Sequence, residues 1–322
     1  MATRSNVNGR VLAISGGIGG AKLALGLYRV LEPERLSVLA NTGDDFEHLG
    51  LHISPDLDTL LYTLADINDP QQGWGRRDET WTFMQALEAL GGETWFRLGD
   101  GDLALHVERT RLLKRGQSLT QITDMLCQRL GVRAALLPMS DDRVRTRVET
   151  KDRVLDFQDY FVRQACAPQV TGFDFNGAET AKPNPRALEV LDDPDLAAVI
   201  ICPSNPFISV DPVLAVPGLR DALLRCAAPT IAVSPIIGGK AVKGPTDKMM
   251  RELGLPRTAV AIARHYGELL DGIVLDSEDE ASAGEIEVPS ICTRTLMHTL
   301  DDREQLAREV LRFAHRLRSI NG

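Results

Sequence analysis

The sequence predicts an α/β fold, a Rossmann-like three-layer sandwich with a mostly parallel sheet and a smaller inserted α+β subdomain. Short apolar runs recur along the chain, amphipathic segments separate them, and several runs end directly in Ser, Asn, Asp, Gly or Pro. Apolar runs of this kind are typical of strands that are buried on both faces. Their alternation with helices favours a parallel sheet that is covered on both sides.

The expected elements follow one another along the chain. The strand-like runs are VLAIS, LSVLAN, AALLPMS, AAVIICPS, PTIAVSPII and DGIVLD. Amphipathic stretches at Ala21–Leu31, Thr80–Leu90 and Ser118–Leu130 predict helices among the first of these strands. The last polar-faced stretch predicts a C-terminal helix with Asp301 or Asp302 as its N-cap.

A different pattern interrupts this alternation between about residues 140 and 190. Residues 143–175 alternate, turn at Lys151–Asp152 and alternate again, which predicts a β-hairpin followed by a helix. An extended strand and a proline-marked helix start follow, up to about Arg186. We therefore expect residues 1–322 to form a single α/β domain in which about 140–190 are an inserted hairpin and helix subdomain.

Composition narrows the class of protein. Of the 322 residues, 43% are hydrophobic and 25% charged, which is ordinary for a soluble enzyme, and the net charge of −9 argues against a nucleic-acid-binding surface. No apolar run reaches the length of a membrane span, and the polar N-terminus lacks a signal-peptide core. The five cysteines are scattered and never spaced as CxxC. We expect reduced thiols in a cytoplasmic protein that binds neither membrane nor nucleic acid.

A glycine-rich turn follows the first strand. Gly16, Gly17 and Gly19 let the backbone turn tightly, and the first amides of the next helix would face an anion. The turn lacks the GxxxxGK[ST] pattern of P-loop NTPases. The dinucleotide pattern GxGxxG fails at Lys22, and the second strand ends in Asn41 where NAD-binding folds carry an acid. We expect a phosphate-bearing ligand other than NAD, the alternative being a turn without a ligand.

Aspartates gather after the second strand. Asp44, Asp45, Asp56 and Asp58 fall within NTGDDFEHLGLHISPDLDT. Carboxylates are suitable ligands for Mg²⁺, and one of them could accept a proton from an attacking hydroxyl. The alternative is helix capping, because Pro55 followed by acids is a good helix N-terminus. Their position opposite the glycine loop favours metal and substrate binding.

Further polar groups follow other predicted strands. Residues 204–206 (Ser-Asn-Pro) offer groups suited to a base edge or a phosphate, and residues 238–240 (Gly-Gly-Lys) offer amides and a cation for a diphosphate. Arg97 could clamp a phosphate or stack on a flat ring, although a lone arginine is more often a surface charge. Three histidines lack the spacing of a zinc site and are interpreted as structural or solvent-exposed: His48, His52 and His106.

Together these segments resemble the 2-phospho-L-lactate transferase family of coenzyme F420 biosynthesis. The resemblance covers about residues 10–300 and rests on SGGIGGAK, ANTGDD, HISPDLDT, GWGRRDETW, LGDGDLALH, LLPMSDDRV, ETKDRVLDFQDYFVR, CPSNPF and VSPIIGGKAVKGP, in that order. It implies transfer of a phospho-acid from a GMP-activated diphosphate donor to the hydroxyl of the deazaflavin Fo, with release of GMP. The acid would be 2-phospholactate, phosphoenolpyruvate or 3-phosphoglycerate.

The resemblance also implies residue roles. Asp45 and Asp58 would be catalytic, Asp58 and Arg97 would contact Fo, and Asp44, Asp45 and Asp56 would hold or approach the cofactor Mg²⁺. The expected nucleotide-binding residues are Gly16, Gly17, Gly19, Lys22, Ser204, Asn205, Pro206, Pro235, Gly238 and Gly239. The expected partners are the two small-molecule substrates, a guanylyltransferase linked through the donor, and a second copy of the chain in a homodimer.

Two other functions are weighed against the transferase. A more distant branch shares the glycine loop and the acidic segment, so the alternative is a non-catalytic regulator that binds a nucleotide sugar. FQDYFV together with SPDLDT favours the transferase. A nicotinamide oxidoreductase is disfavoured by the missing acid after the second strand.

Overall fold

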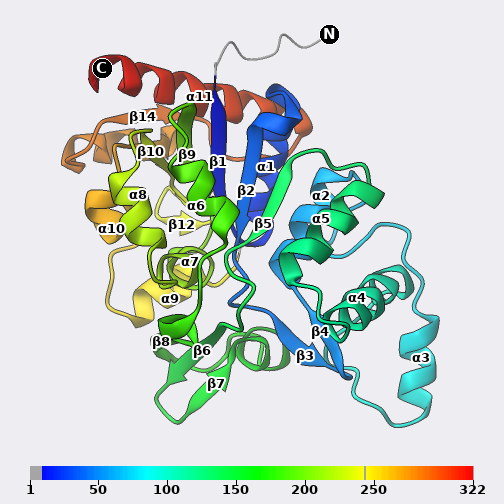
Figure 1. Cartoon of the computed structure of the whole chain (residues 1–322). Coiled ribbons are helices and arrows are strands. Elements are labelled where there is room, and N and C mark those ends of the chain that lie inside the picture. Colours follow the sequence, from blue (N-terminus) through cyan, green and yellow to red (C-terminus); the bar gives the residue numbers. More distant parts are fainter. Residues whose placement is uncertain (1–8, 243, 322) are drawn as a thin grey trace.

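A seven-stranded parallel sheet forms the centre of the structure, a computed structural model that describes residues 9–242 and 244–321 (Figure 1). Its order is β14-β13-β10-β9-β1-β2-β5, and every pairing in it is parallel. The strands are β1 (Arg10–Ser15), β2 (Leu36–Ala40), β5 (Ala135–Pro138), β9 (Leu196–Ile201), β10 (Thr230–Val233), β13 (Gly272–Asp276) and β14 (Ser290–Thr293). The predicted fold class is confirmed, and β14 is the strand that the prediction missed.

Helices cover both faces of this sheet, which explains why its strands read as continuous apolar runs. Along β1, Val11 and Ala13 pack into one core, whereas Leu12 and Ile14 pack into the other. The first core includes α1 (Gly17–Val30), α2 (Pro55–Leu64), α4 (Asp100–Leu113), α5 (Leu119–Arg129) and α11 (Leu300–Asn321). The second includes α6 (Pro185–Leu191), α7 (Asp211–Leu214), α8 (Leu219–Arg225), α9 (Thr246–Glu252) and α10 (Ala259–Tyr266).

The predicted helices are found, with differences at their ends. The helix predicted from Ala21 begins at Gly17, and those predicted at Thr80–Leu90 and Ser118–Leu130 correspond to α3 (Thr82–Ala89) and α5. The predicted N-cap of the last helix is wrong, because α11 begins before both aspartates. Thr299 accepts the amide of Asp302 on its hydroxyl at 3.1 Å and donates its own amide to that carboxylate at 2.8 Å. With this reciprocal capping, Thr299 lies at the N-cap position, two residues before Asp301 and three before Asp302.

Smaller sheets lie around the carboxyl ends of the central strands (Figure 1). The segment between β5 and α6 forms an antiparallel sheet in the order β7-β6-β8. Its strands are β6 (Arg145–Thr150), β7 (Val154–Asp156) and β8 (Val170–Asn176), and the hairpins are β3 (Phe46–His48) with β4 (Leu51–Ile53) and β11 (Ile236–Ile237) with β12 (Lys240–Ala241). The short helical turns are η1 (Pro33–Arg35), η2 (Asp159–Arg163), η3 (Ala178–Thr180), η4 (Pro206–Val210), η5 (Gly267–Leu269) and η6 (Ser277–Glu285).

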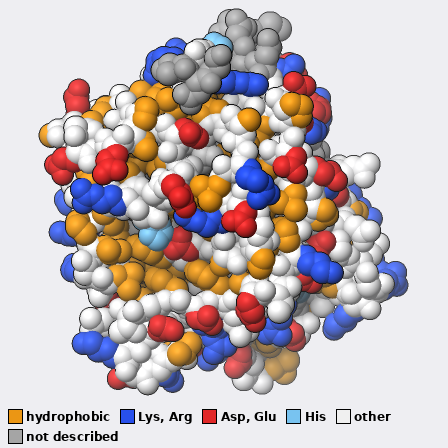
Figure 2. All heavy atoms as spheres, turned by 60° about the vertical axis from the view of Figure 1, so that its left-hand side comes forward, with side chains coloured by type: hydrophobic (Ala, Val, Ile, Leu, Met, Phe, Trp, Pro, Cys, Tyr) orange, Lys and Arg blue, Asp and Glu red, His pale blue; other side chains and the backbone are white. Residues whose placement is uncertain are grey.

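The surface shows no separation of charge on the face drawn in Figure 2, where acidic and basic side chains are interspersed. Among the described helices, none is both long enough and apolar enough to cross a membrane.

The strand order places a crevice beside β1. From β1 the chain moves to β2 and β5 on one side, and it later continues through β9 and β10 on the other. Loops that leave neighbouring parallel strands in opposite directions open a crevice at the carboxyl edge, where ligands of such folds bind. A ligand site is therefore expected at the loops after β1 and β9.

Candidate active site

A cavity of about 560 Å³ opens at this crevice. The predicted site residues that line it are Gly16, Gly17, Gly19, Lys22, Asp44, Asp56, Asp58, Arg97, Ser204, Asn205 and Pro235. The predicted residues outside its lining are Asp45, Pro206, Gly238 and Gly239. Segments that are distant in the sequence therefore meet around one cavity, although their ligands stay predictions.

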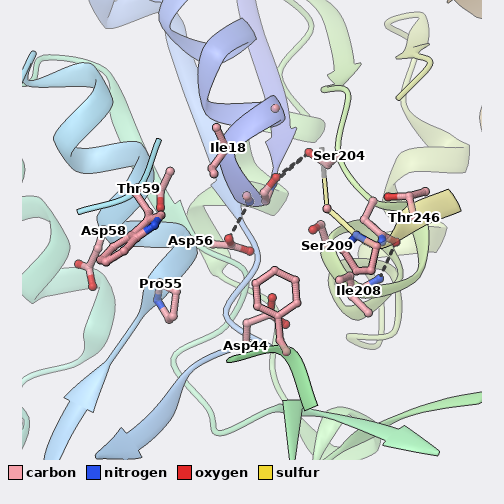
Figure 3. Close-up of a pocket in the computed structure, with 18 of the residues that line it drawn as sticks. Ile18, Asp44, Pro55, Asp56, Asp58, Thr59, Ser204, Ile208, Ser209 and Thr246 are labelled. Atoms are coloured by element: carbon pink, nitrogen blue, oxygen red, sulfur yellow. Dashed lines mark hydrogen bonds between the residues drawn. The ribbon is translucent and has the colours of Figure 1, made fainter. Parts of the chain in front are cut away.

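The glycine loop packs the start of α1 tightly against its neighbours. Gly17 has a φ of +65°, a left-handed conformation that favours glycine. A Cβ at Gly19 would lie 2.4 Å from a backbone oxygen of the loop after β9. The amide of Gly16 donates to Ser204 Oγ at 3.3 Å, and that of Gly17 donates to Asp56 Oδ1 at 2.6 Å (Figure 3). Two amides that were expected to face an anion are thus already hydrogen-bonded within the protein.

Asp44 and Asp56 are the buried acids at the centre of the cavity (Figure 3). Asn41 Nδ2 donates to Asp56 Oδ2 at 2.9 Å, whereas Asp44 Oδ1 is buried and has no hydrogen-bond partner among the described residues. Burial raises the pKa of Asp44 well above its ordinary value, and the charge of Asp56 raises it further. Burial also raises the pKa of Asp56, to about 6. The two carboxylates, which we call the central acids, are short of compensating positive charge.

Asp45 lies beside the central acids but is directed toward the β3–β4 hairpin. Its Oδ2 accepts the hydroxyl of Ser54 at 2.8 Å and lies 3.0 Å from His52 Nε2. Its Oδ1 is buried and, among the described residues, has no hydrogen-bond partner. The helix-capping alternative holds only in part, because Pro55 does begin α2 but Asp56 caps α1.

A second cluster of buried polar groups joins α2 to α4, and we call it the polar seam. Its members are Asp58, Tyr62, Asp102, His106 and Arg109. Arg109 donates from both terminal nitrogens to the two oxygens of Asp58. The Tyr62 hydroxyl donates to Asp102 Oδ1 at 2.5 Å, and His106 Nε2 lies 3.1 Å from the same oxygen. All but Arg109 line the cavity.

Sequence reasoning missed most of this seam. Asp58 was predicted as a site residue, whereas His106 was interpreted as structural or exposed and α4 was not predicted at all. The available signal was spacing: residues 58 and 62 share one face of a helix, as do residues 102, 106 and 109. Two polar stripes at helical spacing indicate a buried seam only when the helices are known to pack together.

One side of the cavity is largely aromatic. This aromatic wall consists of Trp74, Trp95, Phe96, Phe157 and Phe161. Arg163 lies two residues after Phe161, and its guanidinium is 4.4 Å from the centre of the Trp95 ring. Arg97 lies at the exposed rim, with its guanidinium 4.1 Å from the centre of the Trp81 ring. Flat rings and a cation thus belong to the lining of the cavity that also holds Asp58.

The other side is rich in hydroxyl groups. This hydroxyl wall consists of Ser204, Ser209, Ser234, Thr246 and Thr295, and Figure 3 shows the first two and Thr246 opposite Asp58. Asn205 Oδ1 accepts the amide of Phe207 at 3.0 Å, and its amide nitrogen donates to Met249 Sδ at 3.3 Å. Lys22 donates to the backbone oxygen of Met297 at 2.8 Å. A cation and several hydroxyls therefore surround this half of the cavity.

The glycine pair near the end of the chain lies in the turn of the β11–β12 hairpin. Gly238 and Gly239 have φ values of +54° and +74°, and the Gly238 amide donates to Asp279 Oδ2 at 3.1 Å. Pro235, at the base of this hairpin, does line the cavity. The hairpin thus borders the hydroxyl wall without its glycines entering the lining.

Comparisons with known proteins find relatives over nearly the whole chain. A family model described as "2-phospho-L-lactate transferase CofD" matches residues 11–313. A protein of Kitasatospora aureofaciens named phosphoenolpyruvate transferase is 41% identical over 96% of this chain and 99% of its own length. A Streptomyces coelicolor protein of the same name is 39% identical over 96% of this chain and 99% of its own.

A solved structure shares the fold. Protein BH3568 from Bacillus halodurans aligns with a TM-score of 0.63 over 96% of this chain and 99% of its own, at 16% identity. A second structure of the same protein, described as a member of the UPF0052 family, aligns with a TM-score of 0.61. At this identity the likeness supports the sheet and its layers alone.

Proposed function

This chain belongs to the 2-phospho-L-lactate transferase CofD family, and from that premise we propose that it joins phosphoenolpyruvate to the deazaflavin Fo in coenzyme F420 biosynthesis. The family supports a transferase that acts on a three-carbon phospho-acid. Phosphoenolpyruvate is chosen among the three candidate acids because relatives at about 40% identity over most of the chain carry that name. The Fo acceptor and the GMP-activated donor are parts of the proposal.

The observation that carries the proposal is the division of the cavity into two unlike walls with acids between them. The aromatic wall and the rim cation Arg97 suit a flat, conjugated ring such as the deazaflavin. The hydroxyl wall, with Lys22 and the Asn205 amide, suits the ribose and phosphates of a guanosine diphosphate unit. The reacting hydroxyl and phosphorus would then meet beside the central acids.

Mg²⁺ is the cofactor that these acids fit. Asp44 and Asp56 offer oxygen donors in a buried site, and Asp45 lies directly beside them. Asp44 Oδ1 and Asp45 Oδ1 are buried and lack hydrogen-bond partners among the described residues, which is the situation that a cation would relieve. When bound, Mg²⁺ would neutralise the diphosphate and the departing GMP.

The protein's own groups would then position the reactants. Asp58 would accept the hydrogen bond of the Fo hydroxyl, whose oxygen attacks the phosphorus nearer the three-carbon acid. The new phosphorus–oxygen bond forms as the bond to GMP breaks, and the hydroxyl proton passes to a carboxylate, for which Asp58 is the candidate. Such phosphoryl chemistry depends chiefly on positioning and charge stabilisation.

A coupled assay tests the proposal. Purified protein, Fo, GTP, Mg²⁺ and a guanylyltransferase are mixed with each of the three acids in turn, and the products are identified by mass spectrometry. We expect a phosphodiester of Fo with phosphoenolpyruvate. Absence of product while the guanylylated donor accumulates would contradict the transferase proposal. Calorimetric binding of a nucleotide sugar would then favour the regulator.

We also propose that the chain is a homodimer, by analogy with the family. Light scattering on the eluting protein measures its mass, for which twice 35.3 kDa is expected.

A further inference from the structure

We propose that Arg109, a residue outside the cavity lining, is the positioning residue that fixes Asp58 for the acceptor hydroxyl. The inference rests on the proposed function, because Asp58 is taken as the group that meets Fo. It adds a residue to which neither the sequence motifs nor the comparisons assign a role. Arg109 is 2% exposed and reaches the cavity only through its contact with Asp58 and His106.

The contact geometry fixes the orientation of the Asp58 carboxylate. Arg109 Nη1 donates to Asp58 Oδ2 at 3.1 Å, and Arg109 Nη2 donates to Asp58 Oδ1. A guanidinium that binds both oxygens holds the carboxylate in one plane, which a single contact does not achieve. Each carboxylate oxygen keeps a second lone pair, and because Asp58 lines the cavity, these can accept a substrate hydroxyl.

The rest of the seam keeps the guanidinium in place. Arg109 Nη1 lies 3.4 Å from His106 Nδ1, and the other nitrogen of that ring faces Asp102. Tyr62 donates to Asp102, so each buried acid of the seam has polar partners on a neighbouring helix. The Arg109 guanidinium therefore compensates the charge of Asp58, and Tyr62 and His106 are the polar partners of Asp102.

A metal ion is the competing interpretation of this cluster. One ligand atom each from Asp58, Asp102 and His106 lies within 4.8 Å of the others. However, the Arg109 guanidinium already donates to both oxygens of Asp58 and lies beside His106. A second cation there would be repelled at short range, so the structure favours a fixed ion pair over a metal site.

A double-mutant cycle tests the inference. The variants are Asp58→Asn, Arg109→Gln and the double variant, assayed with Fo and with the donor as the varied substrate. We expect each single variant to lower kcat/KM for Fo by about 10²-fold, with the KM for the donor unchanged. The double variant should be no slower than Asp58→Asn alone, because Arg109 acts only through Asp58. Arg109→Lys, which keeps the charge without the planar fork, should recover part of the rate.

Controls separate positioning from folding and from the proposed function. Arg186→Gln breaks an ion pair away from the cavity, in which one guanidinium nitrogen donates to both oxygens of Asp124, and should leave kcat/KM unchanged. The double variant removes both charges of the Asp58–Arg109 pair together, so it reports activity even where Arg109→Gln folds poorly. A further tenfold loss in the double variant, or wild-type kcat/KM for Fo in folded Arg109→Gln or Arg109→Lys, would overturn the inference. A wild-type protein that transfers none of the three acids would instead refute the proposed function.

Discussion

The central acids and the polar seam are two groups of buried carboxylates that border the same cavity, yet their charges are handled in opposite ways. In the seam, Asp58 is paired with Arg109, and Asp102 lies against Tyr62 and His106. Among the described contacts, no ion pair joins either central acid to a basic side chain, and burial raises the pKa of both. Buried charge that the fold compensates is part of the architecture, whereas uncompensated charge at a cavity points to an external cation.

Among the variants considered, Asp44→Asn should have the largest effect on activity. Losing a carboxylate from the proposed Mg²⁺ site should lower kcat by about 10³-fold or more, since the charge of the diphosphate would no longer be offset. Rates measured over a range of Mg²⁺ concentrations, with chelator as the zero point, check this. A variant that retained the wild-type rate and Mg²⁺ dependence would remove Asp44 from the site.

Arg109→Gln should have the largest effect on stability. Removing one partner of a buried ion pair leaves an uncompensated charge and costs about 3–5 kcal/mol. Urea unfolding with and without Asp58→Asn measures this cost, and much of it should return when the carboxylate is removed as well. A loss below 1 kcal/mol would show that the seam does not depend on this pair.

Asp44→Asn should act in the opposite direction on the metal-free protein. Its pKa is raised in the folded state, so as pH rises above the ordinary value of 3.8 the unfolded chain loses its proton first. The free energy of unfolding therefore falls with rising pH through that window. Asparagine does not titrate, so at neutral pH the variant should be more stable by about 1–3 kcal/mol. Thermal unfolding at pH 4 and pH 8 tests the sign, and an equal gain at both would contradict it.

The smallest effect belongs to an exposed ion pair. Arg186 binds both oxygens of Asp124, but both side chains are well exposed. Arg186→Gln should therefore cost only about 0.2–1 kcal/mol in urea unfolding. A cost equal to that of Arg109→Gln would break the distinction between buried and exposed pairs.

The regions of the molecule differ, for physical reasons, in how well they could be predicted from the sequence. Apolar runs revealed six of the seven central strands, and most of the predicted residues that follow β1, β2 and β9 line one cavity, Asp45 and Pro206 excepted. The strand β14 (SICT) is too short and too polar to give the same signal. The helix α4 carries Asp102, His106 and Arg109 on its buried side, so it lacks the apolar stripe by which helices are recognised. Partner choice, such as Asp56 capping α1, depends on contacts between distant segments.

The two walls of the cavity also come from separate stretches of the chain. The aromatic wall is drawn from residues 74–161, whereas the hydroxyl wall is drawn from residues 204–295. These two stretches do not overlap, and β9 lies between them in the sequence. Recombination near residues 176–196 would therefore exchange the hydroxyl wall while leaving the aromatic wall intact, and Lys22 would stay with the N-terminal part. Under the proposed function, the hydroxyl groups on the donor side could change in this way while the aromatic side is kept.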